Sequence, residues 1–344
     1  MLSRTFFISV SLLLASLITL QAHATTFKIA SVAPDGSMWM TLMKQGAKKI
    51  ASETGDRVKF KFYPGGVMGS QETVIKKMRI RQLHGAGFTS GVLGSFYPDS
   101  QIYSLPLTYK SLDEIDYVRK HMDEKIIKGL DEAGIVILGI SEGGMVYPMS
   151  DQPVNRIEEF SQRKVWSPTN NKNVELTLQA IDVAPVPLPI SDVLVGLQTG
   201  LIDTFASSPS AAIALQWHTE IKYITDIPLM YFYSVLALDR DAFNKLSDGD
   251  KKIVRRIMTE TFSRIDENSR KDNIEALQAL QSQGIEILQP DNEVLQQWYH
   301  KGDNATQLIF NEGSLSQESV DTLLSLLDQY RNQQAKLQQF YVGN

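Results

Sequence analysis

The sequence predicts an α/β fold of two lobes joined by one long helix. Short strand patterns alternate with helical patterns over the first two thirds of the chain, which is typical of a mostly parallel sheet covered by helices. Further on, a helical pattern runs over residues 248–283, which corresponds to roughly 54 Å at about 1.5 Å per residue. A helix of that length must bridge two lobes or project into solvent. The apolar residues Ile253, Phe262 and Leu280 favour the bridge.

The chain begins with the features of a secretory signal peptide. Arg4 is the only charged residue before Lys28, residues 6–20 are apolar or carry small hydroxyl groups, and Ala22-His23-Ala24 is a small-x-small cleavage pattern. The apolar run of about 15 residues is short for a membrane span, which needs about 20. We expect cleavage after Ala24, so that residues 1–24 are the signal peptide and about 320 residues remain, enough for two domains.

The composition limits the chemistry of the exported protein. The chain contains no cysteine, which excludes disulfides, Cys-ligated metals, thiol nucleophiles and the cysteine that anchors bacterial lipoproteins. We therefore expect the exported protein to diffuse freely in the periplasm, without a lipid anchor. Separately, we expect it to be a monomer. The net charge is −5 and no basic block is present, so a nucleic-acid partner is not expected. The histidines are not at metal-ligand spacing, and we expect neither a metal nor a cofactor.

The first half of the chain alternates between strands and helices. The run Val58-Lys-Phe-Lys-Phe62 has the period of two that is typical of a half-buried strand, whereas Met40, Met43, Ala47 and Ile50 recur at helical spacing. The predicted strands and helices of this half are, in order, a strand at 27–32, a helix at 38–53, a strand at 58–62, a helix at 71–82, a strand at 85–88, a helix at 112–133 and a strand at 134–140.

The second half contains shorter elements before the long helix. Ser247 with Asp250 three residues later is a helix start, and Gly284 marks the stop. The remaining predicted elements are a strand at 164–166, helices at 173–181 and 192–198, an extended segment at 202–206 and a Gln-rich amphipathic helix at 316–340.

One motif suggests an enzyme. Gly139-Ile-Ser141-Glu-Gly143 matches the G-x-S-x-G nucleophile elbow of serine hydrolases, in which a strand precedes the serine and a helix follows it. The strand is predicted, but residues 144–148 are poor helix formers. A secreted hydrolase that uses Ser141 is therefore a remote hypothesis, and a strand-to-loop turn between the lobes is the alternative reading.

Three segments carry a resemblance to a known family. PGGVMG at 64–69 is followed by a helix and a short strand, and APVPLPISDV at 184–193 and GLQTGLID at 196–203 follow later. Their order and spacing resemble the solute-binding proteins of tripartite ATP-independent periplasmic (TRAP) transporters, in the branch that includes the binders of C4-dicarboxylates and sialic acid. The resemblance extends over about residues 27–289 and includes SLPL at 104–107 and the long helix.

The resemblance implies a periplasmic binding protein of the two-lobed, type II-like fold, in which strands cross between the lobes. The first lobe would contain residues 25–143 and about 232–273, the second lobe 144–231 and about 274–315, and the C-terminal helix 316–344. Such a protein binds a small organic ligand in the cleft and delivers it to the membrane subunits of a permease driven by an ion gradient. It is not an enzyme.

Two departures from the family pattern affect the expected ligand. An arginine within a K-x-R-x-P pattern clamps the ligand's carboxylate in the family, but Trp166 stands at that place here, and Val146 replaces a second family arginine. An aromatic ring and a β-branched side chain favour an apolar, aromatic or cationic ligand over a C4-dicarboxylate. Arg156, Arg163 or a lysine elsewhere could still meet a carboxylate, and Trp166 could instead be a packing residue.

The same alignment implies further residues of the cleft. The acidic residue of the helix that follows the APVPLPIS segment is Asp192, where the family usually has a glutamate. The other residues expected to contact the ligand are Phe88, Thr89, Thr169, Asn170, Ile190, Ser207, Ser208 and Tyr233. A binding protein that docks to a membrane sensor instead of a permease would have the same fold, and stays an alternative.

Overall fold

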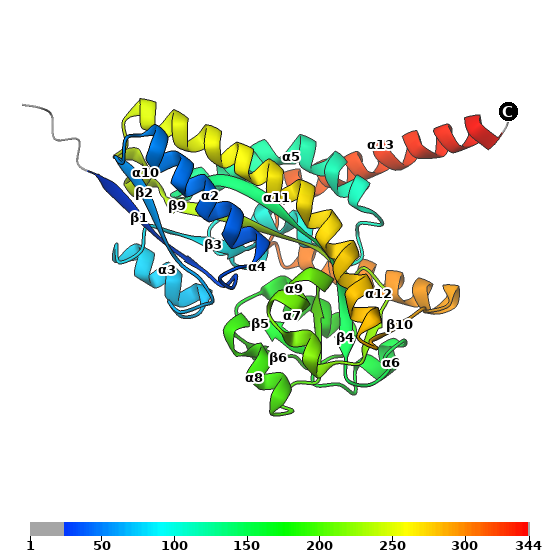
Figure 1. Ribbon diagram of the computed structural model, residues 1–344. Coiled ribbons are helices and arrows are strands. Elements are labelled where there is room, and N and C mark those ends of the chain that lie inside the picture. Colours follow the sequence, from blue (N-terminus) through cyan, green and yellow to red (C-terminus); the bar gives the residue numbers. More distant parts are fainter. Residues whose placement is uncertain (1–23, 343–344) are drawn as a thin grey trace, which may run out of the picture.

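The computed structural model describes residues 24–342 and contains two lobes connected by shared strands and by the helix α11 (Asp248–Ser282) (Figure 1). The predicted signal peptide lies outside the described residues, apart from Ala24. Over the described part of the chain, no helix is both long enough and apolar enough to cross a membrane.

The first lobe is built on a sheet in which β1 (Thr25–Ser31) is the central parallel strand. It pairs in parallel with β2 (Val58–Tyr63) on one side and with β3 (Gly85–Thr89) on the other. The next strand, β9 (Met230–Asp239), is antiparallel to β3 and continues the sheet to the first part of β4 (Ile135–Ser150). As in any β-strand, successive residues of β4 face opposite sides of the sheet.

The two faces of this sheet carry separate hydrophobic cores. Ile137 of β4 packs with α5 side chains such as Met122 on one face, while Leu138 packs with Met43 of α2 and Ile257 of α11 on the other. The helices and 3₁₀ segment of this lobe are α2 (Met38–Glu53), α3 (Gln71–Arg79), α4 (Ser90–Leu93), η1 (Pro98–Ser104), α5 (Leu112–Glu132) and α10 (Arg240–Asn244).

The second lobe lies around the other end of β4, which pairs there with two antiparallel strands, β7 and β8. Its core contains Met149, Phe205 and Trp217. The elements of this lobe are α6 (Ile157–Phe160), β5 (Trp166–Pro168), α7 (Lys172–Ala180), β6 (Val186–Leu188), η2 (Ile190–Asp192), α8 (Val193–Gln198), β7 (Thr204–Ser207), α9 (Pro209–Ala214), η3 (Trp217–Glu220), β8 (Tyr223–Thr225) and β10 (Glu286–Leu288).

The strand β4 joins the lobes, and its course corrects one prediction. It extends through residue 150 instead of ending at 140, pairing first with β9 and then with β7 and β8. Because β4 and β9 run antiparallel to their neighbours, the sheet is mixed, and the prediction of a mostly parallel sheet was wrong. The α/β class itself is confirmed.

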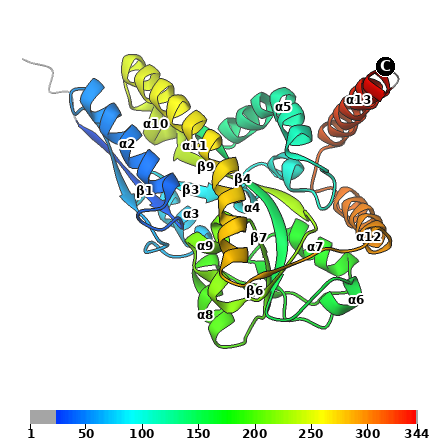
Figure 2. The same cartoon turned by 45° about the vertical axis from the view of Figure 1, so that its right-hand side comes forward.

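The long helix α11 (Asp248–Ser282) spans both lobes, as predicted (Figure 2). Its start is capped by Ser247, whose hydroxyl accepts a hydrogen bond from the backbone N–H of Asp250 at 3.1 Å. Phe262 lies in a core of the first lobe and Leu280 in the core of the second. These contacts place the middle and end of α11 beside the space between the lobes.

Two further helices end the described chain. No prediction was made for α12 (Asn292–Asn311), which leads from Trp298 in the second lobe to Ile309 in a core of the first. The first turns of α13 (Gln317–Val342) pack against α5, whereas its last described turns extend from the body (Figure 1). The residue boundaries predicted for the lobes stay a prediction.

Candidate functional site: a cleft between the lobes

A cavity of about 660 Å³ lies between the lobes, a volume within the usual range for small-molecule sites. The first lobe contributes α3, β3 and η1, and the second contributes β5, α7 and α9. The crossing strands β4 and β9 and one face of α11 complete the wall. The two crossing strands and the long helix α11 therefore all border this cavity.

Most of the residues predicted from the sequence lie along this cavity. Eight of them line it: Phe88, Thr89, Val146, Trp166, Thr169, Ile190, Ser207 and Ser208. Asn170 and Asp192 are exposed and do not line it. Tyr233 points to the opposite side of β9, where its hydroxyl donates a hydrogen bond to the carbonyl of Ser100, so its neighbours Phe232 and Ser234 line the cavity instead.

Trp166 is held firmly in the wall. Its indole N–H donates a hydrogen bond to the carbonyl oxygen of Leu188 at 3.0 Å, and its ring meets that of Trp217 edge to face, with centroids 5.2 Å apart. Only 8% of the residue is exposed. Because the one polar atom of the side chain is already satisfied, Trp166 presents an apolar aromatic surface to the cavity.

The described residues that line the cavity include no lysine, arginine or histidine. Arg156 is exposed and lies outside the lining. Arg163 also lies outside it, because its guanidinium is engaged by the carboxylates of Asp151 and Asp203. Neither arginine named above as a possible partner for a ligand carboxylate therefore borders the cavity.

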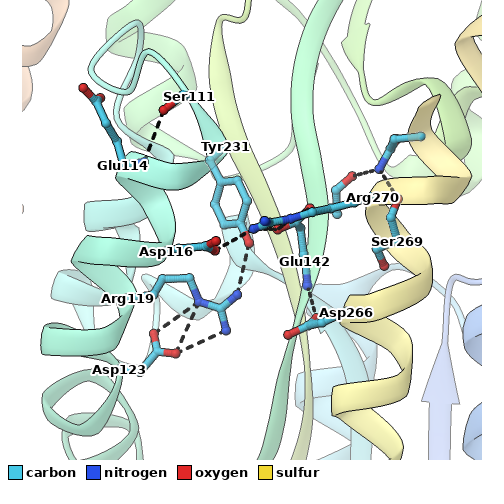
Figure 3. A network of polar contacts seen from close by, with 12 residues as sticks. Ser111, Glu114, Asp116, Arg119, Asp123, Glu142, Tyr231, Asp266, Ser269 and Arg270 are labelled. Atoms are coloured by element: carbon cyan, nitrogen blue, oxygen red, sulfur yellow. Dashed lines mark hydrogen bonds and ion pairs between the residues drawn. The ribbon is translucent and has the colours of Figure 1, made fainter. Parts of the chain in front are cut away.

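The charged residues that do line the cavity are acidic: Glu72, Glu142, Asp272 and Glu275. The charge of Glu142 is balanced by Arg270, which donates hydrogen bonds to both of its carboxylate oxygens and also to Asp116 (Figure 3). These hydrogen bonds raise the pKa of Arg270. The pair connects α11 to β4, and Asp116 extends the connection to α5.

A second arginine lies on the side of β9 that packs against α5, away from the cavity. Arg119 of α5 donates a hydrogen bond to the hydroxyl of Tyr231 at 3.2 Å and pairs with Asp123 (Figure 3). Burial raises the pKa of Tyr231 well above its ordinary value, so the hydroxyl stays protonated. The ring of Tyr231 stacks on that of Tyr233, on the side of β9 that packs against α5, so it supports the wall of the cavity from behind.

Glu72 on the first lobe is hydrogen-bonded across the cleft to the second lobe. The hydroxyl of Thr169, after β5, donates to the carboxylate of Glu72 on α3 at 2.9 Å. Burial acts to raise the pKa of Glu72, but hydrogen bonds from Ser70, its own backbone, Thr169 and Asn170 outweigh it and hold the pKa below its usual value. Glu72 is therefore an ionised carboxylate at the contact of the two lobes.

Two buried polar groups in the wall have no partner among the described residues. These are the side-chain amide nitrogen of Asn173 and the hydroxyl of Ser208, on residues that are 6% and 1% exposed. Both residues line the cavity. Because buried polar atoms in proteins are normally hydrogen-bonded, these two are suited to meet polar atoms of a ligand.

Several lining residues were not anticipated from the sequence. Trp39 is the second residue of α2, Trp217 begins η3, and Glu72 and Asn173 lie in the first turns of α3 and α7. None of them belongs to a motif with a recognisable spacing. They meet only because four separate segments of the two lobes turn toward the same space.

Ser141 does not have the surroundings of a catalytic serine. It lies in the middle of β4, so no helix follows it as a nucleophile elbow requires. Its hydroxyl is 2.7 Å from the hydroxyl of Ser234 and accepts a hydrogen bond from the indole of Trp39 at 3.3 Å. These contacts belong to the packing of β4 and give the hydrolase hypothesis no support.

Comparisons with known proteins agree with this architecture. The sialic acid-binding periplasmic protein SiaP of Vibrio cholerae is 22% identical over 82% of this chain and 89% of the relative. The ectoine-binding periplasmic protein TeaA of Halomonas elongata is 23% identical over 77% and 78%. A TRAP periplasmic solute-binding protein from Desulfovibrio salexigens, solved with bound orotic acid, superposes with a TM-score of 0.81 at 16% identity, covering 88% of this chain and 99% of that one.

The family assignment follows from the larger part of the sequence. The model of the family described as bacterial extracellular solute-binding protein, family 7, matches residues 29–313. Its members are solute-binding proteins, the two relatives above are named as periplasmic binding proteins, and the solved structure is that of a TRAP periplasmic solute-binding protein. The chain thus belongs to family 7 of the bacterial extracellular solute-binding proteins, the TRAP family that its sequence motifs resemble.

Proposed function

We propose that the protein captures a small organic solute in the periplasm and delivers it to the membrane subunits of a TRAP-type permease. The family assignment, the two-lobed fold and the cavity between the lobes support this proposal. So does the hydrogen bond between Glu72 and Thr169, since closure over a solute requires contacts of this kind across the cleft.

The solute differs in class from a C4-dicarboxylate. The observation that carries this point is the lining itself, whose described residues include aromatic, aliphatic, small and acidic ones but no lysine, arginine or histidine. A carboxylate that enters a buried site without a cationic partner costs several kcal/mol. Trp166 and Val146 occupy the positions at which the family resemblance expects the arginines, and neither can offset that cost.

Thermal unfolding in the presence of a metabolite panel tests this proposal. We expect at least one solute without a carboxylate to raise the Tm, and succinate, malate and fumarate to leave it nearly unchanged. Strong stabilisation by any of the three dicarboxylates would contradict the proposed ligand class.

Uptake by cells tests the transport step separately. Deletion of the gene should abolish uptake of the stabilising solute in cells that carry the permease, and the exported protein should restore it. Unchanged uptake in the deletion strain would contradict delivery to a permease.

A further inference from the structure

We infer that the cleft selects a small organic cation and that Glu72 supplies its counter-charge. This inference rests on the proposed function, because it requires that the cleft binds a solute. It concerns the charge of that solute, which follows from how the acidic residues of the lining are compensated.

The four acidic residues of the lining are not equivalent. Glu142 is paired with Arg270, and Glu275, at the exposed rim, has the ammonium of Lys271 at 3.6 Å. Among the described residues, neither Glu72 nor Asp272 has a basic side chain within ion-pair distance. The cleft therefore contains two carboxylates whose charge the protein does not neutralise.

Glu72 is the better placed of these two carboxylates. It lies in the first turn of α3, which Ser70 caps, so the helix N-terminus favours its charged form. Thr169 approaches it from the second lobe, which puts the carboxylate where the two lobes close on a bound solute. A cation held there would contact both lobes.

The rest of the wall suits a cation as well. Trp39, Phe88, Trp217 and Phe232 line the cavity together with Trp166, and aromatic faces attract ammonium and amidinium groups. The unpartnered groups of Asn173 and Ser208 would meet a neutral polar atom of the same solute without adding charge. An anionic solute would instead face uncompensated carboxylates in a partly desolvated space.

The test separates the small molecules of a bacterial extract by charge at pH 7. A cation exchanger retains the net cations, an anion exchanger retains the net anions, and the neutral molecules pass through both. Each fraction is added to the full-length mature protein and the Tm is measured. We expect the cationic fraction to stabilise the protein and the anionic fraction to have no effect.

The variant Glu72→Gln removes the charge but keeps an oxygen that can accept the hydrogen bond from Thr169. We expect it to need at least about tenfold more of the cationic fraction for the same rise in Tm. The matched control Glu286→Gln, at an exposed position of β10, should respond like the wild type. The unliganded Tm of each variant shows whether its fold is intact.

The outcomes separate the two proposals. Stabilisation by the anionic or the neutral fraction alone would overturn the cation inference and leave the binding function standing. A Glu72→Gln protein that responds like the wild type would overturn the role of Glu72. If none of the fractions stabilised the protein, the proposed function itself would fail, and the inference with it.

Discussion

At the scale of single residues, the register of each strand decides which side chains face the cleft. Trp166 and Val146 could be placed in the cleft because the family motifs fix their register in the strands. The placement of Tyr233 in the cleft was wrong. An aromatic run on a strand does not indicate which side chains face the core, and here Phe232 faces the cavity. Glu72 and Trp39 carry no local signal, because tertiary contacts alone bring them to the cleft.

The tryptophans make the site observable by fluorescence. Of the four in the chain, Trp39, Trp166 and Trp217 line the cavity, whereas Trp298 is buried in the second lobe and donates to the carbonyl of Asn155. We expect solute binding to change the emission of the wild type, and Trp166→Phe to reduce that change.

The control for this measurement is Trp298→Phe, which should keep the full change in emission. A signal that is lost with Trp298 but kept in Trp166→Phe would mean that binding acts through the second-lobe core instead of the cleft.

At the scale of elements, the crossing strand β4 explains the glycines of the G-x-S-x-G match. A Cβ at Gly139 would lie 2.2 Å from the ring of Phe262 on α11, and one at Gly143 would lie 1.9 Å from the ring of Phe232 on β9. The backbone of β4 thus approaches both neighbours too closely for any side chain. The two glycines of the motif are therefore explained by close packing at the junction of the lobes.

The substitution Gly139→Ala tests this explanation. The added methyl group must displace Phe262 or shift β4, so we expect a loss of about 1–3 kcal/mol in the free energy of unfolding. Gly249→Ala is the control, because a Cβ there would meet its nearest neighbour, the hydroxyl of Ser247, only at 3.9 Å. Denaturant titration measures both, and equal stabilities would contradict the packing account.

A buried carboxylate attaches the C-terminal helix to the first lobe. Asp99 accepts hydrogen bonds from the backbone and the hydroxyl of Ser316 and from the hydroxyl of Ser319, at the start of α13. Burial acts to raise the pKa of Asp99, but these hydrogen bonds outweigh it and hold the pKa below its ordinary value. The ionised form is therefore the one that stabilises the attachment.

Asp99→Asn should lower the stability by about 2 kcal/mol at neutral pH and speed hydrogen exchange in the first turns of α13. Since folding lowers this pKa, the contribution is complete above the unfolded-state pKa, about 3.9, and disappears as the pH falls through the folded-state value. The difference between wild type and variant should thus shrink below about pH 4. Asp303→Asn, on the exposed face of α12, is the control, and a difference that grew in acid would contradict this assignment.

At the scale of the whole molecule, the long helix was the most informative feature of the sequence. Its length together with its apolar residues favoured a bridge between two lobes, and α11 does pack on the cores of both. The strand β4 was harder to predict in full, because the glycines after residue 138 interrupt the apolar pattern and look like a turn. No motif recognised in the sequence indicated α12, which runs between the lobes. Of the two C-terminal helices, only α13 was therefore predicted.

The central claim is that the cleft of this TRAP-family protein binds an organic solute other than a carboxylate anion. Native mass spectrometry of the protein, exported with its own signal peptide into a bacterial periplasm and purified without unfolding, tests this claim most directly. We predict a bound small molecule that, once released, is identified as an amine, an amidine or another organic cation. Recovery of a dicarboxylate or a sugar acid from the cleft would contradict the account.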